Sequence, residues 1–212
     1  MLKLHPPSLV ATLLEAPEET IARISDIAIL LVELDSLDGA LAQNLLATTS
    51  RKQSLPTPTF DTSSQTRTRV RVSPAAAKSG DSQRRQRRRK PRAFTSAMLE
   101  KQLAGSPHFA VLVAKRHTMT LEPRVRVGRS KSSDIVLSHP TVSSKHAFLD
   151  SDAEDVYFVT DCGSTNGTAV NGEALAPQET VDAYPGDHIQ FGDVDTTLCL
   201  LGTLRSVLVR SR

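Results

Sequence analysis

The sequence predicts an all-β domain, an antiparallel β-sandwich over residues 106–205, preceded by an N-terminal helical segment and a disordered basic linker. Three observations carry this prediction. Short apolar stretches after residue 107 alternate with turns rich in Gly, Asn, Asp and Pro, a pattern typical of β-sandwiches. Residues 51–92 contain few large apolar side chains, and residues 17–48 show an apolar repeat with helical spacing.

Charge is distributed unevenly along the 212 residues, although the formal net charge is only +3. Residues 1–50 carry two basic and seven acidic side chains, residues 51–92 carry thirteen and two, and residues 93–212 carry eleven and fourteen. Aromatic residues make up 4% of the chain, fewer than one folded core of this length normally contains. A basic centre between acidic flanks therefore indicates a modular chain.

The N-terminal segment, residues 1–50, is expected to be helical between residues 17 and 48. Pro17 and two glutamates suit a first helical turn. Apolar residues then recur at steps of three and four, at Ile24, Ile27, Leu31, Leu34, Leu41 and Leu45. This stripe would pair two copies of the chain as a homodimer, bind another partner, or rest on the main domain. A turn at Asp38-Gly39 would instead divide it into a helical hairpin.

The linker, residues 51–92, is rich in Ser, Thr, Pro, Gln and Arg. Such a segment cannot bury enough apolar surface to offset its chain entropy, so we expect disorder. Within it, six of the seven residues in RRQRRRK, residues 84–90, are cationic. This run is a nucleic-acid patch, a nuclear localisation signal or a solvated linker. It contains no aromatic residue on which bases could stack, which favours the linker interpretation.

Nothing in the sequence indicates a signal peptide or a membrane span. The most apolar N-terminal stretch is interrupted by Arg23, Asp26 and Glu33 and is too short to cross a bilayer. Cys162 and Cys199 have no metal-ligand spacing, and we expect reduced structural thiols. The prediction is a cytoplasmic protein without membrane contact, or a nuclear one if the source is eukaryotic.

A short helix is expected within residues 93–105, ending near Gly105 and Pro107. The strands that follow, such as FAVLVAK and HIQFG, have period two or are short apolar runs. In a sandwich of this kind, the loops at one end are expected to carry the function.

Three loops contain the residues with binding chemistry. Arg129 ends a predicted strand, Ser143 stands in a Thr-Val-Ser-Ser-Lys-His loop, and Asn166 stands in a Gly-flanked loop. An arginine presents a planar fork to phosphate, and a serine hydroxyl adds a short hydrogen bond. No nucleophile with a matching base, no carboxylate pair and no metal-ligand spacing accompanies them. The loops therefore predict capture of a phosphate without turnover: no enzyme, no cofactor and no metal site.

Five motifs in this order resemble the forkhead-associated (FHA) domain family: GRS at 128, DIVL at 134, SSKHA at 143, DCGSTNGTAVNG at 161 and GDHIQFG at 186. The resemblance covers residues 106–205. It implies an eleven-stranded sandwich whose apical loops bind phosphothreonine peptides. The phosphopeptide-binding positions would be Arg129, Ser143, Ser144, Lys145, Thr165 and Asn166. The structural positions of the motif would be Gly128, His146, Gly167, Asn171 and Gly172.

The resemblance also assigns roles. Arg129 and Ser143 would bind the phosphate, Thr165 would help to form the pocket for the threonine methyl group, and Asn166 would hold the peptide backbone. Two positions depart from many relatives. Ser144 replaces an Asn or Arg, and Thr141 replaces a basic residue; both changes weaken the positive field around the phosphate.

The predicted function is a non-catalytic phosphothreonine-binding adaptor in Ser/Thr-kinase signalling, with the kinase and a phosphorylated protein as partners. The chain's own linker is a further candidate ligand, because it offers Thr57, Thr59, Thr62, Thr66, Thr68 and Thr95. The alternative is a nucleic-acid-associated regulator that uses residues 84–90 while the sandwich recruits a protein. A third hypothesis is an interaction domain for an unphosphorylated partner.

Overall fold

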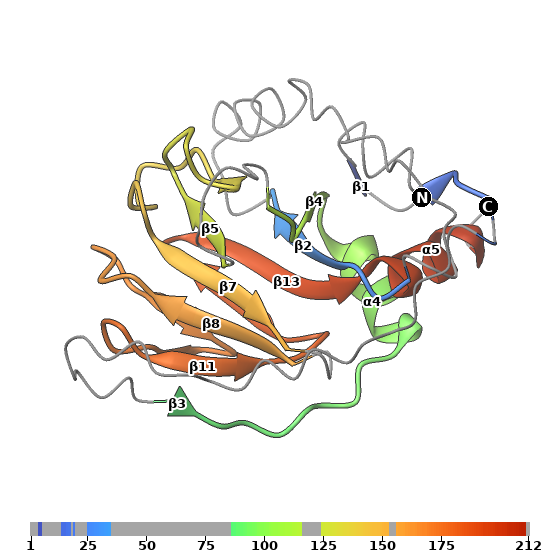
Figure 1. Cartoon of the computed structure of the whole chain (residues 1–212). Coiled ribbons are helices and arrows are strands. Elements are labelled where there is room, and N and C mark those ends of the chain that lie inside the picture. Colours follow the sequence, from blue (N-terminus) through green and yellow to red (C-terminus); the bar gives the residue numbers. More distant parts are fainter. Residues whose placement is uncertain are drawn as a thin grey trace, which may run out of the picture.

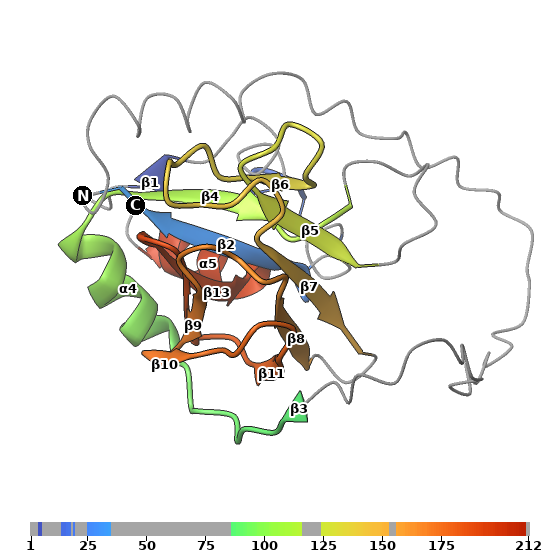
Figure 2. The same ribbon diagram turned by 90° about the vertical axis from the view of Figure 1, so that its left-hand side faces the viewer.

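The computed structural model describes residues 4–5, 14–17, 19, 25–34, 86–115, 124–152 and 156–210. In this part of the chain, eleven strands form a sandwich of two sheets, and two further strands of two residues each extend the edges (Figures 1 and 2). The predicted β-sandwich is confirmed.

The first sheet has the order β1-β4-β2-β13-β12-β9-β10. Its strands are β1 (Leu4–His5), β4 (His108–Leu112), β2 (Ala28–Glu33), β13 (Val194–Leu200), β12 (His188–Phe191), β9 (Thr168–Val170) and β10 (Glu173–Ala174). All neighbours are antiparallel except β1 and β4, which are parallel.

The second sheet has the order β3-β11-β8-β7-β5-β6. Its strands are β3 (Gln86–Arg87), β11 (Thr180–Ala183), β8 (Tyr157–Asp161), β7 (Ala147–Ser151), β5 (Val125–Gly128) and β6 (Ile135–Val136). Here β3 pairs with β11, and β5 with β6, in parallel. The central β5-β7-β8-β11 run is antiparallel.

Strand β2 corrects the prediction of a helix across residues 17–48. Ala28–Glu33 lies between β13 and β4 in the first sheet. Its alternate side chains enter two different apolar clusters: Leu30 and Val32 face the core between the sheets, and Ile29 and Leu31 face the opposite side. A strand buried on both faces is continuously apolar, and a short run of that kind cannot be distinguished from a helix by periodicity. β-branched residues favoured the strand.

The helical stripe therefore loses the residues on which the homodimer prediction depended. Leu31 is 0% and Leu34 is 8% exposed; Leu31 is buried on the outer face of the first sheet and Leu34 in the core between the sheets. The outer positions of the stripe, Ile24, Leu41 and Leu45, lie outside the described residues. No surface of the described residues supports pairing through this stripe.

Two helices cover the outer face of the first sheet (Figure 1). α4 (Ser96–Gly105) confirms the short helix; Thr95 caps it, and Leu99 and Leu103 are buried. α5 (Leu201–Arg210) buries Leu201, Leu204 and Val207. Both helices pack on Ile29, Leu31 and the buried Cys199. Helix α5 is not predicted from the sequence, and the predicted sandwich extends to residue 205, because TTLCLLG continues the strand pattern into the first residues of this helix.

The linker prediction is corrected at its C-terminal end. Gln86–Arg87 forms β3 on the edge of β11, so part of the basic run is ordered against the sandwich. Residues 51–85, with the five threonines from Thr57 to Thr68, lie outside the described residues. Among the helices of the described segments, none is long and apolar enough to cross a membrane. A cytoplasmic location stays a prediction.

Candidate functional site

Two loops meet at one end of the sandwich through Ser143 and Thr165. The Thr165 N–H donates to Ser143 Oγ at 3.0 Å, and the Ser143 hydroxyl donates to Thr165 Oγ1 at 3.3 Å. Ser143 lies before β7, and Thr165 lies between β8 and β9. A loop within the second sheet and a loop that crosses from the second sheet to the first thus hold one partly exposed hydroxyl in a fixed place.

The buried ring of His146 joins the same two loops from the interior of the sandwich. Its Nδ1 accepts the Ser143 N–H at 3.0 Å, and its Nε2 lies 3.1 Å from the Gly167 carbonyl oxygen, to which it donates. The ring is fully buried and meets Phe191 edge-on at 5.8 Å. Burial lowers the pKa of His146 below its ordinary value of 6.5, although the Gly167 hydrogen bond and nearby Asp161 oppose that shift. The neutral Nε2–H tautomer matches both hydrogen bonds.

Arg129 follows β5 and is held by the backbone of the Ser143 loop. Its N–H donates to the Ser143 carbonyl at 2.9 Å, and its Nε donates to the Val142 carbonyl at 3.1 Å. The side chain is exposed, and neither terminal nitrogen contacts another described residue through a hydrogen bond or ion pair. The guanidinium is therefore oriented by one edge and presents the other to solvent.

Gly128 allows β5 to lie close to the backbone of the Ser143 loop. A Cβ at position 128 would overlap the Ser144 carbonyl oxygen and lie 2.9 Å from its carbonyl carbon. Because both neighbours are backbone atoms, any larger residue would push the Ser143 loop away from β5. The glycine is required by close packing and not by its torsion angles.

Asp161 shapes the second loop from its buried position at the end of β8. Its carboxylate accepts the N–H groups of Gly163 at 2.7 Å and Ser164 at 3.0 Å, and the hydroxyls of Ser164 and Thr168 at 2.6 and 2.8 Å. Gly167 ends the loop with φ at 81°, a conformation that glycine adopts most easily. One carboxylate therefore organises the whole turn that presents Thr165.

Asn166 lies beside this turn with its side chain exposed. Its Nδ2 donates to the Thr141 carbonyl at 2.7 Å, which joins the second loop to the first. Thr141 is fixed in turn, because its Oγ1 accepts the Asp193 N–H at 2.9 Å and lies 2.7 Å from His139 Nδ1. The amide oxygen of Asn166 is left to face solvent in the described structure.

The structure places the other predicted site residues around this centre. Ser144 and Lys145 are exposed in the Ser143 loop, and the Lys145 ammonium lies 4.7 Å from the centroid of the Phe148 ring. Asn171 and Gly172, with φ values of 51° and 80°, form the turn after β9, at the end of that strand opposite Gly167. Arg129, Ser143, Thr165 and Asn166 are thus together, whereas the Asn171 turn is separate.

The arrangement suits the capture of an oxyanion. An exposed guanidinium, a partly exposed hydroxyl and an amide side chain converge from three loops, and all are oriented by backbone hydrogen bonds. His146 uses both ring nitrogens in structural hydrogen bonds and is buried. It therefore cannot act as a general base for Ser143.

Sequence comparison decides the family. The FHA domain model matches residues 125–192, which contain every residue of this site. An oxoglutarate dehydrogenase inhibitor of Corynebacterium jeikeium is 33% identical over 118 residues, which are 47% of this chain and 79% of that protein. This chain belongs to the FHA domain proteins. FHA domains are binding modules for phosphothreonine peptides and not catalysts, so the sandwich is a non-catalytic module.

Other FHA relatives match a smaller part of their own length. An FHA domain-containing protein of Arabidopsis thaliana is 35% identical over 75 residues, 35% of this chain, and the match spans 19% of that protein. An oxoglutarate dehydrogenase inhibitor of Corynebacterium efficiens is 39% identical over 90 residues, 39% of this chain and 60% of that protein. The chain thus spans less than two thirds of these two relatives.

Solved FHA domains match over similar lengths. The solution structure of an FHA domain from Arabidopsis thaliana is 28% identical, with a TM-score of 0.37, and covers 43% of this chain and 73% of that one. The N-terminal FHA domain of S. cerevisiae Rad53p, solved with a phosphothreonine peptide, is 21% identical, with a TM-score of 0.33, and covers 39% and 72%. These TM-scores are low, and the family assignment depends on the sequence matches.

Three residues of the FHA motifs have roles that the sequence alone does not reveal. Thr141 stands where some relatives have a basic residue, and its carbonyl accepts a hydrogen bond from Asn166. Asp161 belongs to the fourth motif, and its carboxylate organises the second loop. Asp187 belongs to the fifth motif, and it supports the separate Asn171 turn through a 2.6 Å hydrogen bond. An acid placed just before a Gly-Ser-Thr-Asn-Gly turn was the signal available for Asp161.

Proposed function

We propose that this protein is a non-catalytic adaptor that binds phosphothreonine-containing proteins in Ser/Thr-kinase signalling. The observation that carries the proposal is the junction of Arg129, Ser143 and Thr165. The Arg129 guanidinium and the Ser143 hydroxyl both reach solvent there, and hydrogen bonds join the three loops that carry these residues. The ligand would be a protein that a Ser/Thr kinase has phosphorylated, and that kinase is the second partner.

Each side chain has a distinct task in this proposal. The unused edge of the Arg129 guanidinium would donate two hydrogen bonds to the phosphate, and the Ser143 hydroxyl would donate a third. Thr165 would turn its side chain toward the threonine methyl group. Asn166 would exchange its Thr141 contact for the peptide backbone, or use its amide oxygen for a peptide N–H while it keeps that contact.

Ser144 and Lys145 would flank the ligand. Lys145 is anchored over Phe148, so its charge contributes to the field of the site and not to a direct phosphate contact. With Thr141 in place of a basic residue, Arg129 is the principal cation at the phosphate. We therefore expect a moderate affinity and a strong dependence on this one arginine.

A phosphopeptide library tests the proposal. Matched peptides with phosphothreonine, phosphoserine and threonine at the central position are compared for binding to the full chain. The expected result is binding of phosphothreonine peptides, at least tenfold weaker binding of phosphoserine peptides and none of unphosphorylated ones. Equal binding of phosphorylated and unphosphorylated peptides would instead support an interaction domain for an unphosphorylated partner.

The chain's own linker is a candidate ligand within this proposal. Phosphorylation would add about −1.5 to −2 charge to a linker threonine, and a flexible tether raises its effective concentration to the order of millimolar. Thr95 is the least suited candidate, because it caps α4 and its Oγ1 accepts the Met98 N–H. Amide shifts of Ser143, Thr165 and Asn166 after phosphorylation by a threonine kinase would reveal self-binding; unchanged shifts would exclude it.

The alternative of a nucleic-acid-associated regulator has a weaker basis. The run at residues 84–90 would have to supply its cations, and Arg87 and Arg89 already form ion pairs with the sandwich. The adaptor proposal does not depend on this run.

A further inference from the structure

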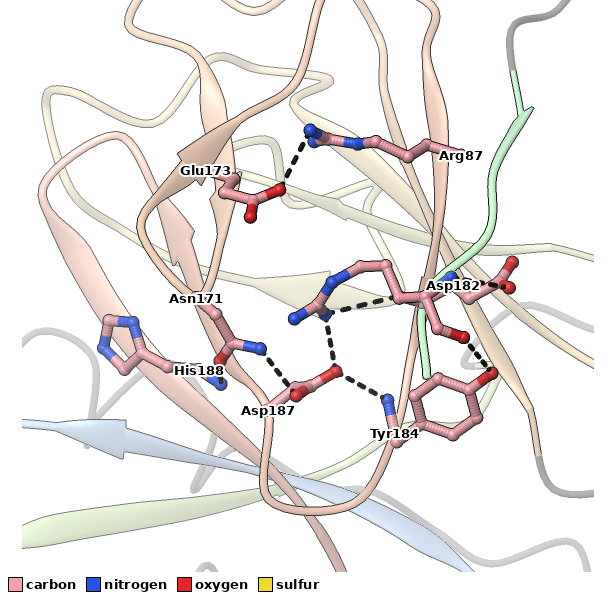
Figure 3. Close-up of polar contacts among 8 residues, drawn as sticks. Arg87, Asn171, Glu173, Asp182, Tyr184, Asp187 and His188 are labelled. Atoms are coloured by element: carbon pink, nitrogen blue, oxygen red, sulfur yellow. Dashed lines mark hydrogen bonds and ion pairs between the residues drawn. The ribbon is translucent and has the colours of Figure 1, made fainter. Parts of the chain in front are cut away.

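The basic run docks on the sandwich at the edge of the second sheet, away from the Ser143 loops. β3 pairs with β11 in parallel, with Gln86 opposite Thr180 and Arg87 opposite Val181. This contact covers the backbone of a strand that would otherwise be an open sheet edge. Figure 3 shows the side chains that surround the run at this edge.

Arg89 is held through both its side chain and its backbone. Its Nη1 lies 2.7 Å from Asp187 Oδ2, and the two side chains are only 15% and 3% exposed. The Arg89 N–H donates to Asp182 Oδ2 at 3.3 Å, and its carbonyl accepts the Tyr184 hydroxyl at 2.9 Å. Removal of only one partner of such a buried, hydrogen-bonded ion pair destabilises a protein strongly, because it leaves the other charge buried and unpaired.

Asp187 is positioned for this arginine by its own turn. Its Oδ1 accepts the Asn171 Nδ2 at 2.6 Å, and its Oδ2 also accepts the Tyr184 N–H at 3.0 Å (Figure 3). Further along the chain, Phe94 packs so closely on Gly186 that a Cβ there would overlap its ring. The receptor for Arg89 is therefore built into the turn between β11 and β12.

Arg87 engages a second pair of acids. Its Nη1 lies 2.9 Å from Glu173 Oε2, and its Nε lies 3.4 Å from Glu179 Oε1. In an extended chain, residues two apart point to the same side, so Arg87 and Arg89 face the sandwich together. Arg88 and Lys90 are exposed on the other side. The fold thus divides the basic run into two sets of cations.

We propose that Glu173, Glu179, Asp182 and Asp187 form a docking site for an Arg-x-Arg strand, which residues 86–90 occupy as an intramolecular latch. The latch withholds Arg87 and Arg89 from polyanions and leaves Arg88 and Lys90 available to them. The inference is independent of phosphothreonine binding, because the carboxylates of these four acids form no hydrogen bond or ion pair with Arg129, Ser143, Thr165 or Asn166 in the described structure.

The first test compares two neighbouring arginines of equal charge in the full chain. The probe is a 20-base-pair DNA duplex, and the readout is the slope of log affinity against log salt concentration. Each phosphate neutralised contributes about 0.9 to that slope. Arg88→Ala is expected to reduce the slope by about 0.9, whereas Arg87→Ala is expected not to reduce it. Equal effects, or no effect of either substitution, would overturn the proposal.

The second test releases Arg87 without changing the run itself. Glu173→Gln/Glu179→Gln removes both carboxylates from Arg87 and leaves the buried Asp187 in place. The slope is expected to increase by about 0.9, because Arg87 becomes available to the duplex. Asp150→Asn/Asp193→Asn removes the same charge from two exposed positions and should leave the slope unchanged. A slope that does not increase in the first variant, or increases equally in both, would contradict the latch.

Discussion

The N–H of Thr165 and the Oγ of Ser143 are 3.0 Å apart, although the two residues are separated by 22 positions in the sequence. This hydrogen bond, with the Asn166 contact to the Thr141 carbonyl at 2.7 Å, ties the two binding loops together before any ligand arrives. A site that is already assembled loses less conformational entropy when it binds.

Ser143→Ala should weaken phosphothreonine-peptide binding by at least tenfold. The substitution removes a donor to a charged phosphate, which contributes about 1.5–3 kcal/mol, and it also removes the link to Thr165. Ser151→Ala is the matched control, since Ser151 is exposed at the end of β7 far from the Ser143 loop and its hydroxyl has no hydrogen bond within the described structure. It should change the affinity less than threefold. Titration calorimetry with one peptide distinguishes these residues, and equal losses would refute the assigned role of Ser143.

Acid should destabilise the protein through His146. Because burial lowers the pKa of this histidine, the unfolded chain binds a proton near pH 6.5 that the folded chain does not accept until a lower pH. The stabilisation is complete above pH 6.5 and decreases as the pH falls toward the folded pKa, by up to about 1.4 kcal/mol per pH unit.

Denaturant unfolding between pH 7 and 5 measures this effect, with His146→Gln as the comparison. The variant should be less stable at pH 7 and should lose less stability on acidification. An NMR titration of the wild type that gives His146 a pKa at or above 6.5 would contradict the buried, neutral imidazole.

Two glycine-to-alanine substitutions should have opposite effects. Gly128→Ala places a Cβ against the Ser144 carbonyl and should reduce the free energy of unfolding by about 1–3 kcal/mol, as overpacking usually does. Gly105→Ala, at the end of α4, meets no atom within 4 Å and should be neutral or stabilise by up to about 1 kcal/mol. Chemical denaturation compares the two. A harmless Gly128→Ala would mean that β5 and the Ser143 loop are not in close contact.

The sequence predicted the sandwich, and the loops whose residues the structure brings together, because turn chemistry marks both. Gly128, Asp161 and Gly167 are required by a close backbone contact, a carboxylate-capped turn and a positive φ, and each leaves a recognisable residue. The N-terminal strand β2 has no comparable signal in the sequence. Ile29 and Leu31 pack on helices while Leu30 packs between the sheets, so β2 lacks the alternation of a surface strand. Contacts between distant segments, such as Arg89 with Asp187, cannot be predicted from local pattern.

Deletion of residues 1–34 should therefore unfold the domain. Ile29, Leu30, Leu31 and Val32 are each 0% exposed. Burial of one such side chain contributes about 1.5–3 kcal/mol, and four together equal the total stability of a typical domain. Circular dichroism and NMR of residues 35–212 should show loss of the folded state, with recovery when a peptide of residues 24–36 is added. A folded, cooperative 35–212 fragment would show that β2 is dispensable.

One calorimetric series tests the proposed contact of Arg129 with phosphate most directly. A phosphothreonine peptide selected from the library is titrated into the wild type, Arg129→Ala and Arg129→Lys. Each charge-assisted hydrogen bond contributes about 1.5–3 kcal/mol, and the fork makes two, so the alanine variant should lose measurable binding while unfolding as the wild type does. Lysine should restore little, because an ammonium cannot reproduce the planar fork. Near-equal affinities of the wild type and Arg129→Ala would contradict the phosphate assignment.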